Sequence, residues 1–135
     1  MIISETEINT KKAKVTLTND NHILIKVFED QELELSDVKE INSAKREIAA
    51  GKLNTVIFIP GKFGAITKAA REFSASEEAC HNTIAKAIVT NSISGKLIAN
   101  FFIKINKPLS PTKLFSSLTE AINWLNSMRM ISEVC

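Results

Sequence analysis

The sequence has few of the residues that form tight turns, covalent cross-links or metal sites. Four glycines and three prolines in 135 residues argue against an all-β protein with many turns. The two cysteines, Cys80 and Cys135, are scattered and do not resemble a disulfide framework. Of the two histidines, His22 falls in a predicted turn and His81 adjoins Cys80, a spacing that suits chelation poorly. We therefore expect no metal site.

Long apolar runs are also missing. The most apolar stretch, residues 97–105, is nine residues long and includes Asn100 and Lys104. A helix that crosses a bilayer needs about 20 apolar residues, so we expect no membrane insertion. The first twelve residues have no apolar core of the kind found in signal peptides, and cytoplasmic localisation is expected.

Motifs for catalysis and for phosphate binding are absent as well. Neither a P-loop nor a G-x-G-x-x-G sequence occurs, and no G-x-S-x-G turn presents a nucleophilic serine. Cys80 and His81 are adjacent and do not form a nucleophile–base pair. The sequence therefore predicts a protein that is not an enzyme, with no catalytic residues and no cofactor.

Charge is unevenly distributed. Residues 1–50 hold seven Lys/Arg and ten Asp/Glu, whereas residues 51–135 hold ten and five. No acidic residue lies between Glu78 and Glu120, a segment that carries five lysines: Lys86, Lys96, Lys104, Lys107 and Lys113. This basic region either faces an anion or only keeps the protein soluble, and the second interpretation is favoured because the net charge is a modest +2. A nucleic-acid partner is not expected.

The order of apolar runs predicts an α/β domain. Five stretches are typical of strands: 14–18, 23–28, 55–59, 84–90 and 113–116. Helical spacing is found at 37–50, with Ser36 as N-cap, and in a short helix that Thr67 caps and that runs through Phe73. Ser76 can cap one or two further turns, and two more helices are predicted at 92–106 and from 117 onward. Strands alternating with helices imply a mixed, mainly parallel sheet of about five strands, an N-terminal antiparallel hairpin and about four helices.

The length fits one domain spanning residues 1–135. Residues 1–12 are expected to form an extra edge strand or a flexible arm, and residues 130–135 a flexible tail.

This order of elements, together with several segments between Ala69 and Leu125, resembles a known family. The segments read Ala-Arg-Glu-Phe at 70–73, Ser-Glu-Glu-Ala at 76–79, Ile-Ala-Asn-Phe-Phe-Ile-Lys-Ile-Asn-Lys-Pro at 98–108, Pro-Thr-Lys-Leu-Phe at 111–115 and Glu-Ala-Ile-Asn-Trp-Leu at 120–125. The chain resembles STAS domains, and more closely the small single-domain bacterial proteins described as SpoIIAA-like or STAS/SEC14-like. The resemblance implies a non-enzymatic regulatory or protein-interaction module that binds a protein partner or itself, with a homodimer as one form. The alternative is a small-ligand or lipid carrier of SEC14-like type.

In anti-sigma-factor antagonists, a Ser or Thr that begins a helix is phosphorylated to switch partner binding. The resemblance points to Thr67, but the family's Asp-Ser-Ser-Gly-like signature is missing, since residues 61–67 read Gly-Lys-Phe-Gly-Ala-Ile-Thr. Gly61, Lys62 and Gly64, with Thr67, form a candidate regulatory or anion-facing helix start. The simpler interpretation of the glycines is a turn that needs two flexible residues.

Helix 92–106 supplies a candidate contact surface, comprising Phe101, Phe102, Lys104 and Lys107. Adjacent phenylalanines cannot share one narrow helical stripe. Either the helix is buried broadly, which we expect, or one phenylalanine is exposed and marks a contact with a partner. In the carrier alternative, this helix lines a pocket and lysines hold an acidic head group.

Overall fold

The computed structural model describes residues 6–134 and contains one six-stranded sheet. Its strands, in spatial order, are β1 (Glu7–Asn9), β2 (Ala13–Leu17), β3 (Ile23–Val27), β5 (Asn54–Ile59), β7 (Thr83–Val89) and β8 (Thr112–Phe115). The first three strands are antiparallel, and β3, β5, β7 and β8 pair in parallel. A short parallel pair, β4 (Glu32–Leu33) and β6 (Ala65–Ile66), stands apart from this sheet. The predicted mixed α/β sheet with its N-terminal hairpin is confirmed.

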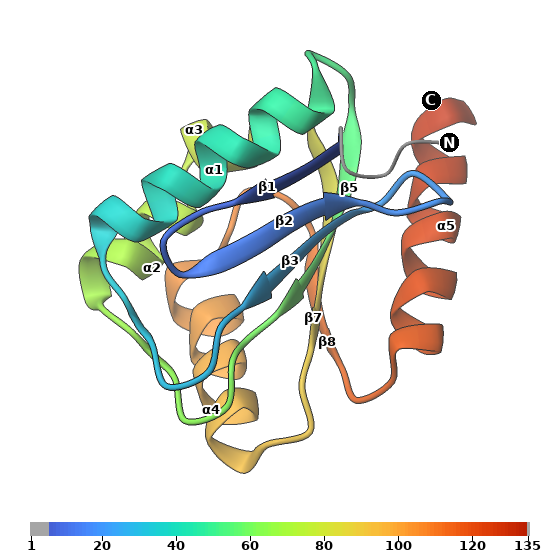
Figure 1. Ribbon diagram of the computed structural model, residues 1–135. Coiled ribbons are helices and arrows are strands. Elements are labelled where there is room, and N and C mark those ends of the chain that lie inside the picture. Colours follow the sequence, from blue (N-terminus) through green and yellow to red (C-terminus); the bar gives the residue numbers. More distant parts are fainter. Residues whose placement is uncertain (1–5, 135) are drawn as a thin grey trace.

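Helices cover both faces of the sheet (Figure 1). They are α1 (Leu35–Ala49), α2 (Lys68–Ser74), α3 (Glu77–Cys80), α4 (Ile93–Phe101) and α5 (Leu118–Val134). The π-helical segment η2 (Phe102–Asn106) continues α4 without a break. Figure 1 shows α5 alone on one face, with α1, α2 and α4 on the other.

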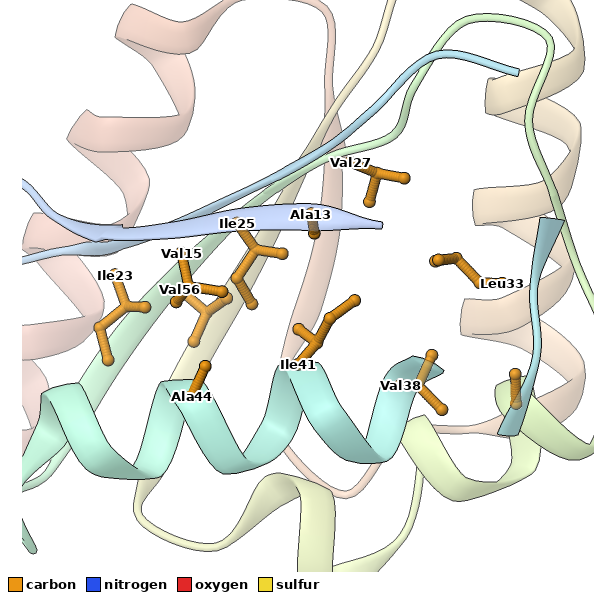
Figure 2. Packing of buried hydrophobic residues seen from close by; sticks show 11 residues of the cluster. Ala13, Val15, Ile23, Ile25, Val27, Leu33, Val38, Ile41, Ala44 and Val56 are labelled. Carbon is orange, nitrogen blue, oxygen red and sulfur yellow. The ribbon is translucent and has the colours of Figure 1, made fainter. Parts of the chain in front are cut away.

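Buried apolar clusters on both faces of the sheet hold these layers together. On one face, Ile41 and Ala44 of α1 point toward Val15, Ile25 and Val56 of the sheet (Figure 2). On the other face, buried side chains of α5 pack on small residues of β7: Ala121 and Leu125 on Ala85 and Ala87. Alternate residues of β5 and β7 thus serve opposite cores, as strands covered on both sides require.

The start of α1 differs from the prediction. The helix begins at Leu35 with Glu34 as N-cap, and Ser36 lies inside the first turn. The Asp37 carboxylate accepts a hydrogen bond from the Glu34 amide at 2.8 Å and contacts the Lys12 ammonium at 2.8 Å. Asp37 is thus the third helical residue of a capping box and bonds back to the amide of the N-cap residue Glu34.

Regular secondary structure is found near both ends of the described chain. β1 lies within residues 1–12, the range for which the sequence allowed an extra edge strand. α5 runs to Val134, so the tail predicted for 130–135 is helical up to that residue, and Cys135 lies outside the described residues. The Arg129 guanidinium fixes this end of α5 by donating hydrogen bonds to the carbonyls of Asp20 and Asn21 at 3.0 and 2.9 Å.

His22 is fully buried, although its sequence context predicted a turn. Its Nε2 lies 3.0 Å from Asn126 Oδ1, so Nε2–H donates there and Nδ1 is left as an acceptor. Thr55 Oγ1, at 2.6 Å, and Arg129 Nη2, at 2.9 Å, both face Nδ1. Burial and the Arg129 charge lower the pKa of His22, and the Asp20 carboxylate opposes them. The ring thus ties the hairpin to β5 and α5 in its neutral form.

Stability is expected to fall below about pH 6.5, because His22 takes up a proton more readily in the unfolded chain than in the folded one. The loss reaches at most about 1.4 kcal/mol for each further pH unit, down to the folded-state pKa. Urea unfolding at about pH 7.5 and pH 5.0 measures it. His22→Gln should flatten this dependence, while the control His81→Gln, at an exposed position, should keep it. Equal pH dependence in the two variants would show that His22 is not responsible.

Candidate functional site: a cationic apolar pocket beneath helix α4

A pocket of about 100 Å³ lies between the sheet, α2 and α4. Its walls are mostly apolar, and its apolar lining residues include Val27, Leu33, Val38, Phe58, Ile66, Ile88, Ile98, Ala99 and Phe102. Ala65, Ser92 and Ser94 also line it and are exposed, so the pocket reaches the molecular surface beside them. It sits where β5 and β7 end, the edge at which parallel α/β sheets commonly bind ligands.

Two glycines allow the backbone to close around this pocket. A Cβ on Gly61 would lie 2.1 Å from the Phe28 carbonyl oxygen, so no other residue fits where the loop after β5 crosses the end of β3. A Cβ on Gly95 would lie 2.6 Å from Thr90 Oγ1 and 2.7 Å from Ser92 Oγ. Gly95 therefore lets the first turn of α4 pack against the end of β7.

Lys86 of β7 places an ammonium group in this apolar site. Its Nζ lies 6.0 Å from the centre of the Phe58 ring and 5.7 Å from that of Phe102. Among the residues that the structure describes, none accepts a hydrogen bond from Lys86 or forms an ion pair with it. Burial lowers the pKa of Lys86 because the charged form loses hydration.

Lys45 provides a contrast within the same molecule. Its side chain is more deeply buried than that of Lys86, and its Nζ donates hydrogen bonds to the Ala79 carbonyl at 2.5 Å and to Thr83 Oγ1 at 3.0 Å. Burial lowers its pKa to about 8. Lys45 is thus a structural lysine whose ammonium group has hydrogen-bond acceptors. The ammonium group of Lys86 has only cation–π contacts with Phe58 and Phe102, which compensate for part of the hydration that it loses.

Arg71 of α2 brings a second cation to the pocket wall. One terminal nitrogen donates to the Ile66 carbonyl at 2.8 Å, and the guanidinium lies 5.0 Å from the centre of the Phe101 ring. Its Nε is buried and has no hydrogen-bond partner. A buried donor without a partner costs free energy, which an acceptor atom in the pocket would recover.

The start of α4 adds further donors. Ser92 caps the helix by accepting a hydrogen bond from the Gly95 amide at 2.9 Å. Amides in the first turn of a helix carry partial positive charge, and with the Ser94 hydroxyl they border the same pocket. None of the described lining residues is acidic, so the charge of the site is positive throughout.

No described lining residue is a histidine, a cysteine or a carboxylate, the groups that most often transfer protons or attack substrates. Across residues 6–134, no cluster of three His, Cys, Asp or Glu side chains is placed to hold a metal ion. The described helices include none that is long and apolar enough to cross a membrane. The groups that the described pocket walls present are instead apolar side chains, hydroxyls and the cations Lys86 and Arg71.

Of the four residues predicted to form an anion-facing helix start, two line the pocket and two lie outside it. Gly61 and Gly64 line the pocket, whereas Lys62 is exposed in the loop. Thr67 lies outside the pocket and caps the short helix α2, where its Oγ1 accepts a hydrogen bond from the Ala70 amide at 3.2 Å. The regulatory role of these four residues stays a prediction.

Thr67→Ala is expected to destabilise the fold by about 1 kcal/mol, because α2 loses its N-cap acceptor. Thr67→Asp supplies another good cap and should cost only a few tenths of that amount. Thermal or urea unfolding of the two variants measures the difference. If both variants lose the same stability, the hydroxyl is not acting as a cap, and Thr67 is freer for modification than its geometry indicates.

The predicted contact surface needs a correction. Phe102, the first residue of η2, is buried, whereas Phe101 is 46% exposed, so the expected broad burial of this helix is wrong. The reason is geometric: adjacent residues on a helix point about 100° apart, and the sheet covers only one side. Lys104 and Lys107 are exposed, as the surface requires. Whether they contact a partner stays a prediction.

Sequence reasoning missed Lys86 and Arg71 as members of one site. Lys86 did stand out, as the single charge within an apolar strand. A charge in a strand covered on both faces is a signal of function, since burial without a partner is costly. Arg71 gave no comparable signal, because charged residues are ordinary on short helices.

The fold and the site together define the class of this protein. It is a small α/β domain with a SpoIIAA-like fold and a cationic apolar pocket. The chain belongs to the family described as domain of unknown function (DUF7793), which matches residues 15–129. Among solved structures, it is similar to an uncharacterized protein of the DUF3478 family with a SpoIIAA-like fold from Shewanella loihica PV-4. The TM-score is 0.59 at 12% identity, over 87% of this chain and 98% of the other. This likeness shows the fold alone. No curated protein matches the sequence.

Proposed function

We propose that the protein is a non-enzymatic binding module for small anions with an apolar body. The observation that carries this proposal is the Lys86 ammonium, which lies among aromatic rings in a pocket whose described walls hold no acid. A bound carboxylate would supply the missing counter-charge and raise the pKa of Lys86. It would also accept a hydrogen bond from the unpartnered Nε of Arg71.

The pocket volume limits the ligand to a small body. An engineered cavity of about 150 Å³ holds a benzene molecule. The 100 Å³ found here therefore suits a short alkyl chain or a compact ring, with a longer ligand extending past Ser92 and Ser94 to the surface. A short-chain carboxylate such as hexanoate fits this description. Its eight heavy atoms correspond to about −5 kcal/mol of binding free energy, or a Kd on the order of 0.1–1 mM.

Calorimetric titration with three ligands of one chain length tests the proposal. Hexanoate is expected to bind, hexan-1-ol to bind about tenfold more weakly because it lacks charge, and hexylammonium not to bind because Lys86 and Arg71 repel it. Chemical-shift changes should fall on residues that line the pocket, such as Ile88 and Ala99. Equal affinity for hexanoate and hexan-1-ol, or shifts confined to surface lysines, would refute an anion-selective pocket.

The wider role predicted from the STAS resemblance, a regulatory or protein-interaction module, is the second candidate. The observation in its favour is that α4 forms a wall of the pocket with Ala99 while Leu97 on the same helix is exposed. Occupancy of the pocket can then alter a surface that a partner contacts. Hydrogen exchange of α4 with and without hexanoate tests this coupling. Unchanged exchange across α4 in the saturated protein would argue against such regulation.

A further inference from the structure

The outer face of α4 and η2, with the loop that follows, carries a stripe of apolar side chains open to solvent. This α4 stripe consists of Ile93, Leu97, Phe101, Ile105 and Leu109, with exposed fractions of 80%, 66%, 46%, 63% and 66%. Residues four positions apart lie on one side of a helix, which groups Ile93, Leu97, Phe101 and Ile105, and Leu109 follows in the loop. In Figure 1, α4 lies at the end of the molecule opposite the C-terminus.

Packing within the domain does not explain the α4 stripe. The side of this helix that faces the sheet already buries Gly95, Ala99 and Phe102. The helix is therefore apolar on two sides. On the second side the Arg71 guanidinium lies over the Phe101 ring, and the other members of the stripe stay largely exposed. Contiguous exposed apolar surface of this kind usually marks an interaction site.

The charges around the α4 stripe all have one sign. Lys96, Lys104 and Lys107 lie between or beside its members, and Lys104 and Lys107 are exposed. No Asp or Glu occurs in residues 79–119. The face thus combines apolar side chains with uncompensated positive charge.

The loop between β5 and β6 repeats the same combination. Phe63 is 84% exposed and adopts a left-handed backbone conformation with φ 57°, next to the exposed Lys62. Such a conformation is unusual for a bulky side chain. Because Gly64 and Ser94 line one pocket, this loop lies beside the start of α4. Phe63 therefore adds an exposed apolar side chain, next to a lysine, on a loop that borders the pocket.

The composition of this surface favours a lipid bilayer over a protein partner. Protein interfaces are depleted in Lys, and their strongest contacts come from Trp, Tyr and Arg, none of which is in the α4 stripe. Helices that lie in a membrane interface pair Leu, Ile and Phe on one face with lysines beside them. A second copy docked symmetrically on the same face would bring its lysines against these lysines.

We propose that this face docks on the surface of a bilayer that contains anionic lipids. The α4 stripe and Phe63 contact the boundary between head groups and acyl chains, and Lys62, Lys104 and Lys107 contact the anionic head groups. The contact is peripheral and needs no membrane-spanning helix. It goes beyond the binding of a small anion and does not depend on it, although it places the pocket opening against the membrane.

Vesicle flotation tests this docking. The protein is expected to float with phosphatidylcholine vesicles that contain about one third phosphatidylglycerol, and to bind pure phosphatidylcholine about tenfold more weakly. Raising the salt from about 0.05 M to about 0.5 M should weaken binding because it screens the lysines. The double variant Ile93→Gln, Leu97→Gln should lose at least about tenfold in binding.

A control variant replaces two exposed apolar side chains elsewhere. Leu53 and Ile131 are 62% and 58% exposed, and neither belongs to the α4 stripe, so Leu53→Gln, Ile131→Gln should float like the wild type. Circular dichroism checks the folding of both variants. Equal flotation of the two double variants, or no flotation of the wild type, would overturn the proposal, as would a wild-type dimer that is lost in Ile93→Gln, Leu97→Gln. Titration with hexanoate in the absence of vesicles reports separately on the pocket.

Discussion

Replacing Lys86 with methionine is expected to make the free protein more stable and to abolish its preference for anions. We expect the free energy of unfolding to rise by about 1 kcal/mol, because an apolar side chain of similar length replaces an ammonium group without a counter-charge. Hexanoate affinity should fall about tenfold to a hundredfold, the range for a lost hydrogen bond to a charged group. Stability and function therefore make opposite demands on this position.

Urea unfolding and calorimetric titration of the same Lys86→Met preparation measure both effects. Lys113→Met is the matched control, since Lys113 is an exposed lysine on the neighbouring strand β8 and lies 5.6 Å from the centre of the Phe115 ring. It should change neither quantity appreciably. A Lys86→Met protein that is less stable than the wild type and binds hexanoate normally would mean that Lys86 only packs against its rings.

Gly61→Ala is expected to cost about 3 kcal/mol of stability and to weaken hexanoate binding in the protein that remains folded. The added Cβ would lie 2.1 Å from the Phe28 carbonyl oxygen, and no side-chain rotation can separate them, because the backbone fixes the position of each atom. Relief requires the loop after β5 to move away from the end of β3. This movement would displace Pro60 and Gly64, which line the pocket.

Gly51→Ala separates backbone strain from damage to the pocket. Gly51 has φ 81°, but a Cβ there would meet nothing within 4 Å. This variant should lose about 1 kcal/mol and keep wild-type affinity for hexanoate. If Gly61→Ala behaved in the same way as Gly51→Ala, the close approach of Gly61 to Phe28 would not shape the pocket.

The sequence was sufficient for the fold because its signals are local. The apolar residues recur with the period of a strand at 23–28 and 84–90 and with the period of a helix at Val38, Ile41 and Ala44. Packing the helix on the sheet buries these apolar faces together. Failures occurred where a distant side chain competes with a local one. Asp37, held by Lys12, displaces Ser36 from the start of α1, and Arg129 stabilises a helical turn where a flexible tail was predicted.

The site was predictable only in part, for the same reason. Gly61 and Gly64 were recognised from the loop that they form. Lys86 and Arg71 line one pocket only because the fold brings α2 and β7 to the same site, and their spacing in the sequence does not indicate this. Likewise, the sequence showed that Phe101 and Phe102 point apart, but only the packing against the sheet decides which one is exposed.

A nuclear magnetic resonance titration of the Lys86 side chain, with lysines labelled at Cε, gives the decisive result. In the free protein, the Lys86 resonance should titrate below the usual lysine pKa of 10.5, because burial disfavours the ammonium form. Saturation with hexanoate should move this pKa upward, since the carboxylate stabilises the charge, and saturation with hexan-1-ol should not. A Lys86 pKa that is ordinary in the free protein and unmoved by hexanoate would contradict an anion pocket at this position.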